Sequence, residues 1–205
     1  MDADPAAFRP APAALIVAAD AARAGHYPAD DPTLLRVRRG VYTPRAAWDD
    51  LAEWDRYLLR VHALALTRRD AVFSHESAAA LWGLPLFGHP RRIHLFDTRR
   101  TRSLTYGDVT AHTSEEARSP VVRDGIRSST ASDTVIDLAR TLPPAMGLSV
   151  ADAAARAGLV DPAALLQHAE SQRNRWGRLR MMWVLSRIDA RSESVTESLS
   201  RAVIE

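Results

Sequence analysis

Residues 34–44, LLRVRRGVYTP, constrain the fold of this 205-residue chain more than any other segment. Leu35 and Val37 alternate with arginines, and Val41 begins a second apolar stretch after Gly40. Alternation with a period of two is typical of a β-strand, and a glycine can take the positive φ that a tight turn requires. The segment therefore predicts a short β-hairpin whose exposed side carries guanidinium groups.

Such a hairpin is typical of the wing of a winged helix–turn–helix domain, where guanidinium groups bind phosphates or enter a minor groove. The candidate DNA-binding residues are Arg36, Arg38, Arg39, Tyr42 and Arg45. Arg45 extends the patch at the start of the next helix, whereas Tyr42 has the alternative of a half-buried strand aromatic. The alternative for the arginines is a solvated hairpin, because all 27 basic residues are arginine, as a GC-rich bacterial coding bias produces.

The composition limits the kinds of partner that the chain can have. An apolar content of 46% is enough for a buried core, and a formal net charge of +2 means that any nucleic-acid surface must be local. The absence of cysteine excludes disulfides and thiolate metal sites. No run approaches the roughly 18 apolar residues of a membrane span, and the start lacks the cationic segment of a signal peptide. We therefore expect a cytoplasmic protein with no membrane partner.

The sequence predicts an α+β fold in four parts. These are a disordered Pro/Ala-rich tail over residues 1–12, a degenerate winged-helix-like domain over 13–70, a mixed α/β domain over 71–145, and a helical section over 146–205. In the second part, a short helix over residues 13–25 precedes the hairpin and a longer helix over 46–68 follows it. Apolar residues recur at steps of three and four on one face of the longer helix: Leu51, Trp54, Leu58, Val61 and Ala65.

Capping and turn residues place the elements of the third part. Ser74 is a good N-cap for an alanine-rich helix that Gly83 ends. Strands are predicted over residues 92–96 and 109–113, and a hairpin turn at Asp124-Gly125. A helix over residues 129–142 follows, ended by two prolines.

The fourth part is predicted to be all helical. Helices start at Ser149 and Ser194, each with an acidic residue three positions later, and at Asp161, which a proline follows. Another helix covers residues 176–188. The tryptophans are assigned to the core or to an interface: Trp48, Trp54, Trp82, Trp176 and Trp183.

Three segments in order carry a resemblance to a known family. They are the hairpin at 34–44, then SHESAAALWGLPL at 74–86 followed by RRIHLFDT, and IRSSTASDTVIDLAR at 126–140. Their order and spacing resemble the actinobacterial AbiEi-type antitoxins of type IV toxin–antitoxin systems. The resemblance implies a winged helix followed by a mixed α/β domain, and a transcriptional regulator whose partner is DNA. It also implies a nucleotidyltransferase-like toxin, which the antitoxin counters without a need for physical contact.

The tail at residues 189–205 is similar to the opening of a very-short-patch-repair endonuclease domain of the PD-(D/E)XK type. In that resemblance, Glu197 matches the acidic residue on the first helix. Such a site needs further carboxylates and a lysine, and this sequence has no lysine. We therefore expect no catalytic residue, no cofactor and no enzymatic activity. A truncated endonuclease that lacks its catalytic core and a protein-interaction module stay as alternatives.

The histidines are not expected to form a metal site. The pair His75-Glu76 is predicted to hydrogen-bond locally at a helix start, and His62, His94 and His112 are expected to be scattered over different elements. A second group of arginines is predicted to be a solvated face, with a DNA or partner contact as the alternative: Arg91, Arg92, Arg99, Arg100 and Arg102.

Overall fold

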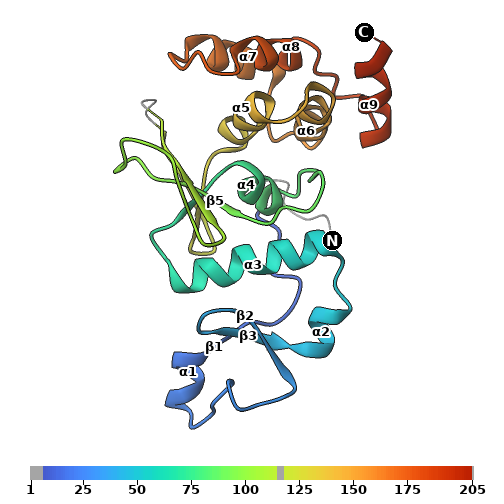
Figure 1. Cartoon of the computed structure of the whole chain (residues 1–205). Coiled ribbons are helices and arrows are strands. Elements are labelled where there is room, and N and C mark those ends of the chain that lie inside the picture. The colour runs from blue at the N-terminus through green and yellow to red at the C-terminus, as the bar shows by residue number, and fades with distance from the viewer. Residues whose placement is uncertain (1–6, 115–117, 205) are drawn as a thin grey trace.

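The computed structural model describes residues 7–114 and 118–204. The elements form a column, with a small sheet at one end, helix α3 (Glu53–Thr67) and a larger sheet in the middle, and a group of helices at the other end (Figure 1). The predicted α+β class is confirmed. Within the described residues, no helix combines the length and the apolar character needed to cross a bilayer.

The small sheet contains the predicted hairpin. β2 (Leu34–Arg38) and β3 (Val41–Pro44) pair antiparallel around Gly40, whose φ of +77° fits the turn. β1 (Ile16–Val17) pairs with the other edge of β3, so the strand order is β1-β3-β2. The helix predicted over residues 13–25 is wrong at its start, because Ile16 and Val17 pair with β3 and leave six residues for α1 (Ala18–Arg23).

The helix predicted over residues 46–68 is two helices, α2 (Arg45–Asp49) and α3. The break lies at residues 50–52, where Ala52 takes an extended conformation before α3 begins. The buried face of α3 includes Leu58 and Val61, as the periodicity predicts. Trp54, however, lies in the first turn of α3 and is 60% exposed, so of the two assignments, core or interface, the core is wrong for it.

The larger sheet has the strand order β6-β7-β5-β4-β9-β8. Its strands are β4 (Val72–Phe73), β5 (Ile93–Phe96), β6 (Leu104–Tyr106), β7 (Val109–His112), β8 (Val121–Arg123) and β9 (Ile126–Ser128). The pairs β5–β7 and β4–β9 are parallel, and the other neighbours are antiparallel. Asp124 and Gly125 both have positive φ in the two-residue turn between β8 and β9, which confirms the predicted hairpin.

Helices α4 (His75–Trp82) and α5 (Ala131–Thr141) pack against each other, and α4 also packs on β5. The structure contradicts Ser74 as a side-chain N-cap: its Oγ lies 3.1 Å from Nδ1 of His75 and makes no cap hydrogen bond. The side chain of Thr130 caps α5 instead, by accepting a hydrogen bond from the backbone N–H of Asp133.

Four helices follow α5: α6 (Pro144–Arg156), α7 (Pro162–Ser171), α8 (Arg178–Leu185) and α9 (Val195–Ile204). The predicted helix start at Ser149 is wrong. Pro144 occupies the first turn of α6, where its missing N–H costs nothing, and Ser149 lies in the middle of that helix. The predicted caps at Asp161 and Ser194 are confirmed.

The beginning of the described chain is packed rather than disordered. Phe8 is 6% exposed and meets the ring of Trp82 edge-to-face at 4.8 Å, and the backbone N–H of Arg9 donates to the carbonyl oxygen of Leu81 at 2.7 Å. The expected disordered tail over residues 1–12 is therefore wrong for residues 7–12, because an aromatic side chain fills a site beside α4. Residues 1–6 lie outside the described part.

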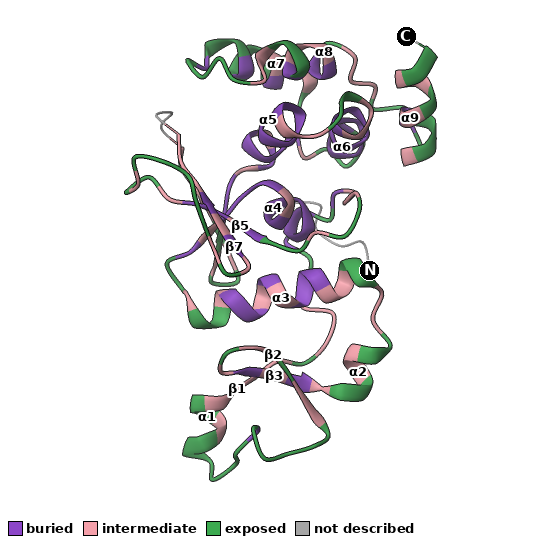
Figure 2. Ribbon diagram, viewed as in Figure 1, coloured by how far each residue is buried: buried purple, intermediate pink, exposed green. Residues whose placement is uncertain are grey.

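The apolar core runs through the middle of the column. A contiguous set of buried side chains extends from Tyr57 in α3 through Leu81 and Ile136 to Val184 in α8. The small sheet, by contrast, consists mostly of half-buried and exposed residues (Figure 2). Its position therefore depends more on polar contacts than that of the larger sheet does.

The packing of Phe8 leads to a first prediction. We expect Phe8→Ala to lower the free energy of unfolding by about 3 kcal/mol, because the substitution leaves a cavity beside Trp82. Chemical denaturation followed by circular dichroism measures this change. Tyr27→Ala, which removes an aromatic ring that is 65% exposed, is the control and should change stability by less than about 0.5 kcal/mol. Equal stability of the two variants would contradict the assignment of Phe8 to the core.

Candidate nucleic-acid interface

Two of the predicted DNA-binding residues lie opposite each other on the small sheet. Arg36 of β2 pairs with Tyr42 of β3, and Tyr42 pairs in turn with Ile16 of β1. Directly opposite residues of antiparallel strands share a face of the sheet, so these three side chains form a row across it. Arg36 is exposed at the outer edge, whereas Tyr42 is half-buried in the centre.

Arg36 and Arg39 are free to bind a ligand. Arg39 lies in the turn beside Gly40 and is exposed, as Arg36 is. Neither guanidinium has a hydrogen bond or an ion pair with any residue in the described ranges. Two solvated cations on one hairpin are the kind of feature that contacts phosphate oxygens.

Arg38 has a different role. Its side chain is 17% exposed and donates to Oδ2 of Asp108, which also accepts from Arg60 of α3 at 2.9 Å. Partial burial by itself raises the pKa of the Asp108 carboxyl, but the hydrogen bonds from both arginines outweigh burial and lower that pKa below its usual value. Arg38 thus connects the hairpin to α3 and to the β6–β7 turn, and its charge is neutralised there.

Arg45 lies at the other end of the hairpin from the turn. It begins α2 directly after Pro44, and its side chain is exposed, with long contacts of 3.4 and 3.5 Å to the carbonyl oxygens of Pro32 and Leu34. At about 3.3 Å per strand residue, it lies more than ~10 Å along the strands from Arg39. The hairpin therefore presents cations at both of its ends.

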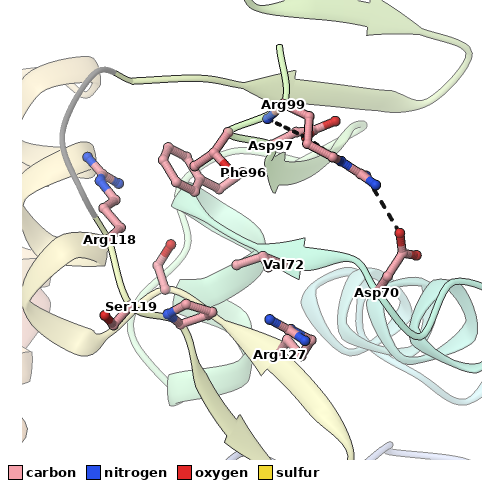
Figure 3. Close-up of a pocket in the computed structure, with 11 residues that line it drawn as sticks. Asp70, Val72, Phe96, Asp97, Arg99, Arg118, Ser119 and Arg127 are labelled. Atoms are coloured by element: carbon pink, nitrogen blue, oxygen red, sulfur yellow. Dashed lines mark hydrogen bonds and ion pairs between the residues drawn. The ribbon is translucent and has the colours of Figure 1, made fainter.

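Arg99, from the second group of arginines, lines a pocket of about 270 Å³. Val72 and Phe96 line it with apolar atoms, and Arg99 and Arg127 lie on either side of Val72 (Figure 3). Two of the arginines in this group are paired, because Arg99 and Arg100 both donate to Asp97 at 3.1 Å. This local pairing lowers the charge that the group offers to a nucleic acid.

Three histidines come together beside this pocket, which sequence reasoning did not foresee. His112 of β7 stacks on His75 of α4 with ring centres 3.8 Å apart, and its Nε2 lies 2.8 Å from Nδ1 of His94 in β5. His62, on α3, contacts the carbonyl oxygen of Arg9 instead. The expectation that His62, His94 and His112 are scattered is therefore wrong for His94 and His112, because parallel pairing of β5 and β7 brings their two strands together.

Buried charges surround these histidines. Arg118 donates two hydrogen bonds to Asp137 of α5, at 2.6 and 2.8 Å, and Asp137 lies 3.7 Å from Nδ1 of His75. His94 has a second neighbour in Glu76, at 3.5 Å. The pair His75-Glu76 thus contacts other elements as well as its own helix start.

Burial keeps two of these imidazoles neutral. It lowers the pKa of His112 to about 3, and it also lowers the pKa of His94. No group of three or more histidine or carboxylate side chains within the described ranges is arranged to hold a metal ion. Among these residues, Arg118 is the one that lines the pocket. The network joins the larger sheet to α5, and we assign it a structural role.

Glu197, the residue matched to a nuclease carboxylate, caps α9. Its carboxylate accepts a hydrogen bond from the backbone N–H of Glu193 at 2.8 Å, and its own N–H donates to Oγ of Ser194. Ser194 is therefore the N-cap of α9, and the carboxylate of Glu197 accepts from the residue before that cap instead of from the cap itself.

The chain was compared with known proteins. No protein-family model matches it, and no curated protein matches it. The proposed function therefore rests on the geometry of the side chains.

The neutral histidines lead to a second prediction. An unfolded chain protonates its histidines below about pH 6.5, whereas folded His112 resists protonation down to about pH 3, so stability must fall as the pH drops through this range. The pKa of Asp137 is lowered, and the stability that its carboxylate contributes is lost only as the pH falls below the usual aspartate pKa. Between pH 7 and 5 the change therefore comes from histidines, and we expect a loss of about 1–2 kcal/mol.

Urea denaturation at a series of pH values measures this loss. His112→Asn should flatten the dependence between pH 7 and 5, whereas His26→Asn, at an exposed position, should leave it unchanged. The assignment of His112 as a half-buried, neutral imidazole is wrong if the slope is the same in both variants.

Proposed function

We propose that this protein binds duplex DNA through the wing hairpin, defined as residues 34–44, and acts as a DNA-binding regulator. The observation that carries this proposal is the pair of exposed guanidiniums, Arg36 and Arg39, which have no partner among the described residues. With a net charge of +2 for the whole chain, attraction to phosphate must come from local groups of this kind. Arg45 extends the same surface beyond Pro44.

The order of the elements supports a winged-helix origin for this part. A strand, a helix and a hairpin follow one another, and the three strands pair in the order β1-β3-β2. Helix α1 has only six residues, and Arg23 in its last turn pairs with Asp20 at 3.1 Å. Because α1 offers little to a major groove, we assign binding to phosphate contacts and to arginine insertion in the minor groove.

The Arg38–Asp108 ion pair adds to this proposal. It connects the hairpin to the turn between β6 and β7, and Arg60 of α3 binds the same carboxylate. A hairpin that is fixed before binding loses less conformational freedom when it contacts DNA. Arg38 therefore positions the hairpin and does not itself contact phosphate.

The biological role follows the family resemblance. Like the AbiEi-type antitoxins that it resembles, the protein would act in the cytoplasm on the promoter of its own operon and counter a nucleotidyltransferase-like toxin. The endonuclease alternative has less support, because the carboxylate of Glu197 is engaged as a helix cap.

A salt titration tests the wing hairpin. We expect the double variant Arg36→Ala, Arg39→Ala to bind a duplex from the upstream region of the gene more weakly. The slope of log affinity against log salt should fall by about two, one for each lost phosphate contact. Fluorescence anisotropy at several salt concentrations gives both quantities.

The matched control is Arg23→Ala, Arg191→Ala. It removes two exposed arginines that are already paired with Asp20 and Asp189, and it changes the net charge equally. An equal slope in the test and control variants would exclude the hairpin from DNA binding. In that case a protein-interaction module would become the better description.

A further inference from the structure

The segment of residues 171–188 holds more arginines, without an intervening acidic residue, than any other stretch of the chain. It contains five arginines and no acidic residue, between Glu170 and Asp189. The segment includes the end of α7, the loop over residues 172–177 and helix α8. It lies at the opposite end of the column from the wing hairpin (Figure 1).

Large apolar side chains are exposed within this basic segment. Trp176 is 65% exposed and Leu179 is 88% exposed, so the core is wrong for Trp176, which the sequence pattern assigned to the core or to an interface. Arg175 and Arg178 flank the tryptophan in the sequence, and neither guanidinium has a hydrogen bond or an ion pair with a residue in the described ranges. In the sequence, the indole ring lies between an exposed arginine, Arg175, and a half-buried one, Arg178. This order matches a base between two phosphates, since single-strand binding combines aromatic stacking with a cationic groove.

A buried arginine fixes the loop that carries Trp176. Arg140 of α5 is 3% exposed, and its guanidinium donates to Oε1 of Gln172 at 3.0 Å, to the carbonyl oxygen of Asn174 at 3.1 Å and to that of Trp176. The side chain of Asn174 accepts from the backbone N–H of Trp176. A buried, charged group that supports an exposed loop gives that loop a defined conformation before any ligand binds.

Gly177 shows how closely the loop contacts Arg140. Its φ is +64°, and a Cβ at this position would lie 2.9 Å from the carbonyl oxygen of Arg140. Any other residue would force the loop away from α5. The position of Trp176 is therefore built into the fold, rather than being the result of a loosely attached surface loop.

The surface beside the loop is polar. A groove of about 680 Å³ runs from Arg173 and Asn174 to the larger sheet, where hydroxyl and guanidinium groups line it: Thr98, Arg100, Thr101 and Thr113. Such a lining suits the sugar and phosphate groups of a nucleic acid and does not suit acyl chains. This observation favours a nucleic acid over an anionic membrane as the occupant.

We infer that the Trp176 loop, defined as residues 172–180, binds single-stranded nucleic acid. Trp176 stacks on an unpaired base, and Arg175 and Arg178 bind the phosphates on either side. This surface is distinct from the wing hairpin and does not depend on the duplex binding proposed for it.

The test uses the full chain and a fluorescently labelled 15-nucleotide oligothymidine. We expect Trp176→Ala to weaken binding roughly tenfold, in the range that loss of one stacked base produces. Arg175→Ala, Arg178→Ala should weaken binding and lower the salt slope by about 1.5, at roughly 0.7 for each phosphate on a single strand. Both substitutions lie at the surface, and thermal melting checks that the variants fold.

Two controls separate this surface from others. Trp54→Ala removes a tryptophan that is 60% exposed outside the basic segment, and it should leave binding unchanged. Arg36→Ala, Arg39→Ala should affect the duplex and not the single strand, so failure of either proposal can be recognised separately. Wild-type affinity of both Trp176-loop variants for oligothymidine would overturn the inference. So would binding to phosphatidylserine vesicles that requires Trp176, without detectable binding to oligothymidine.

Discussion

The carboxylate of Asp108 determines where the wing hairpin lies relative to the rest of the molecule. It accepts hydrogen bonds from Arg38 of the hairpin and from Arg60 of α3. The small sheet has few fully buried side chains, with Val41 and Thr43 among them, so apolar burial alone fixes it weakly. Removing one member of a partly buried ion pair leaves the others without compensation, which makes such a contact costly to break. The direction in which the exposed arginines point therefore depends on one acidic residue in a strand turn.

Arginine has two roles in this chain. Arg38, Arg118 and Arg140 each use the planar guanidinium to connect segments that are distant in the sequence. Others, such as Arg36 and Arg175, are exposed to solvent. The number of arginines therefore does not measure the tendency of the protein to bind nucleic acid. The relevant quantity is the number of arginines whose guanidinium lacks a carboxylate or carbonyl partner. This number depends on the tertiary structure.

Several features that depend on neighbouring residues could be predicted from the sequence, although the side-chain caps predicted at Ser74 and Ser149 are wrong, and features that depend on distant residues were missed. The turn at Gly40 and the cap at Asp161 were predicted because each is specified within a few positions. Ile16–Val17 was assigned to a helix because its strand partner lies about 25 residues away. In the candidate site, the sequence identifies the hairpin arginines, but it does not predict the ion pair of Arg38 with Asp108. The contact of His94 with His112 requires the parallel pairing of β5 and β7, which no local pattern specifies.

The hydrogen bonds at the start of α9 have a consequence for mutagenesis. The side chain of Glu197 accepts from the N–H of Glu193, so its removal would fray the first turn of a helix that packs on α6 and brings Arg201 to buried Asp152. An alanine scan would then record a defect at Glu197 and suggest a reactive carboxylate, although the damage would be to packing. Glutamine retains an acceptor at this position, so comparing it with alanine distinguishes a missing reactive group from a misfolded terminus.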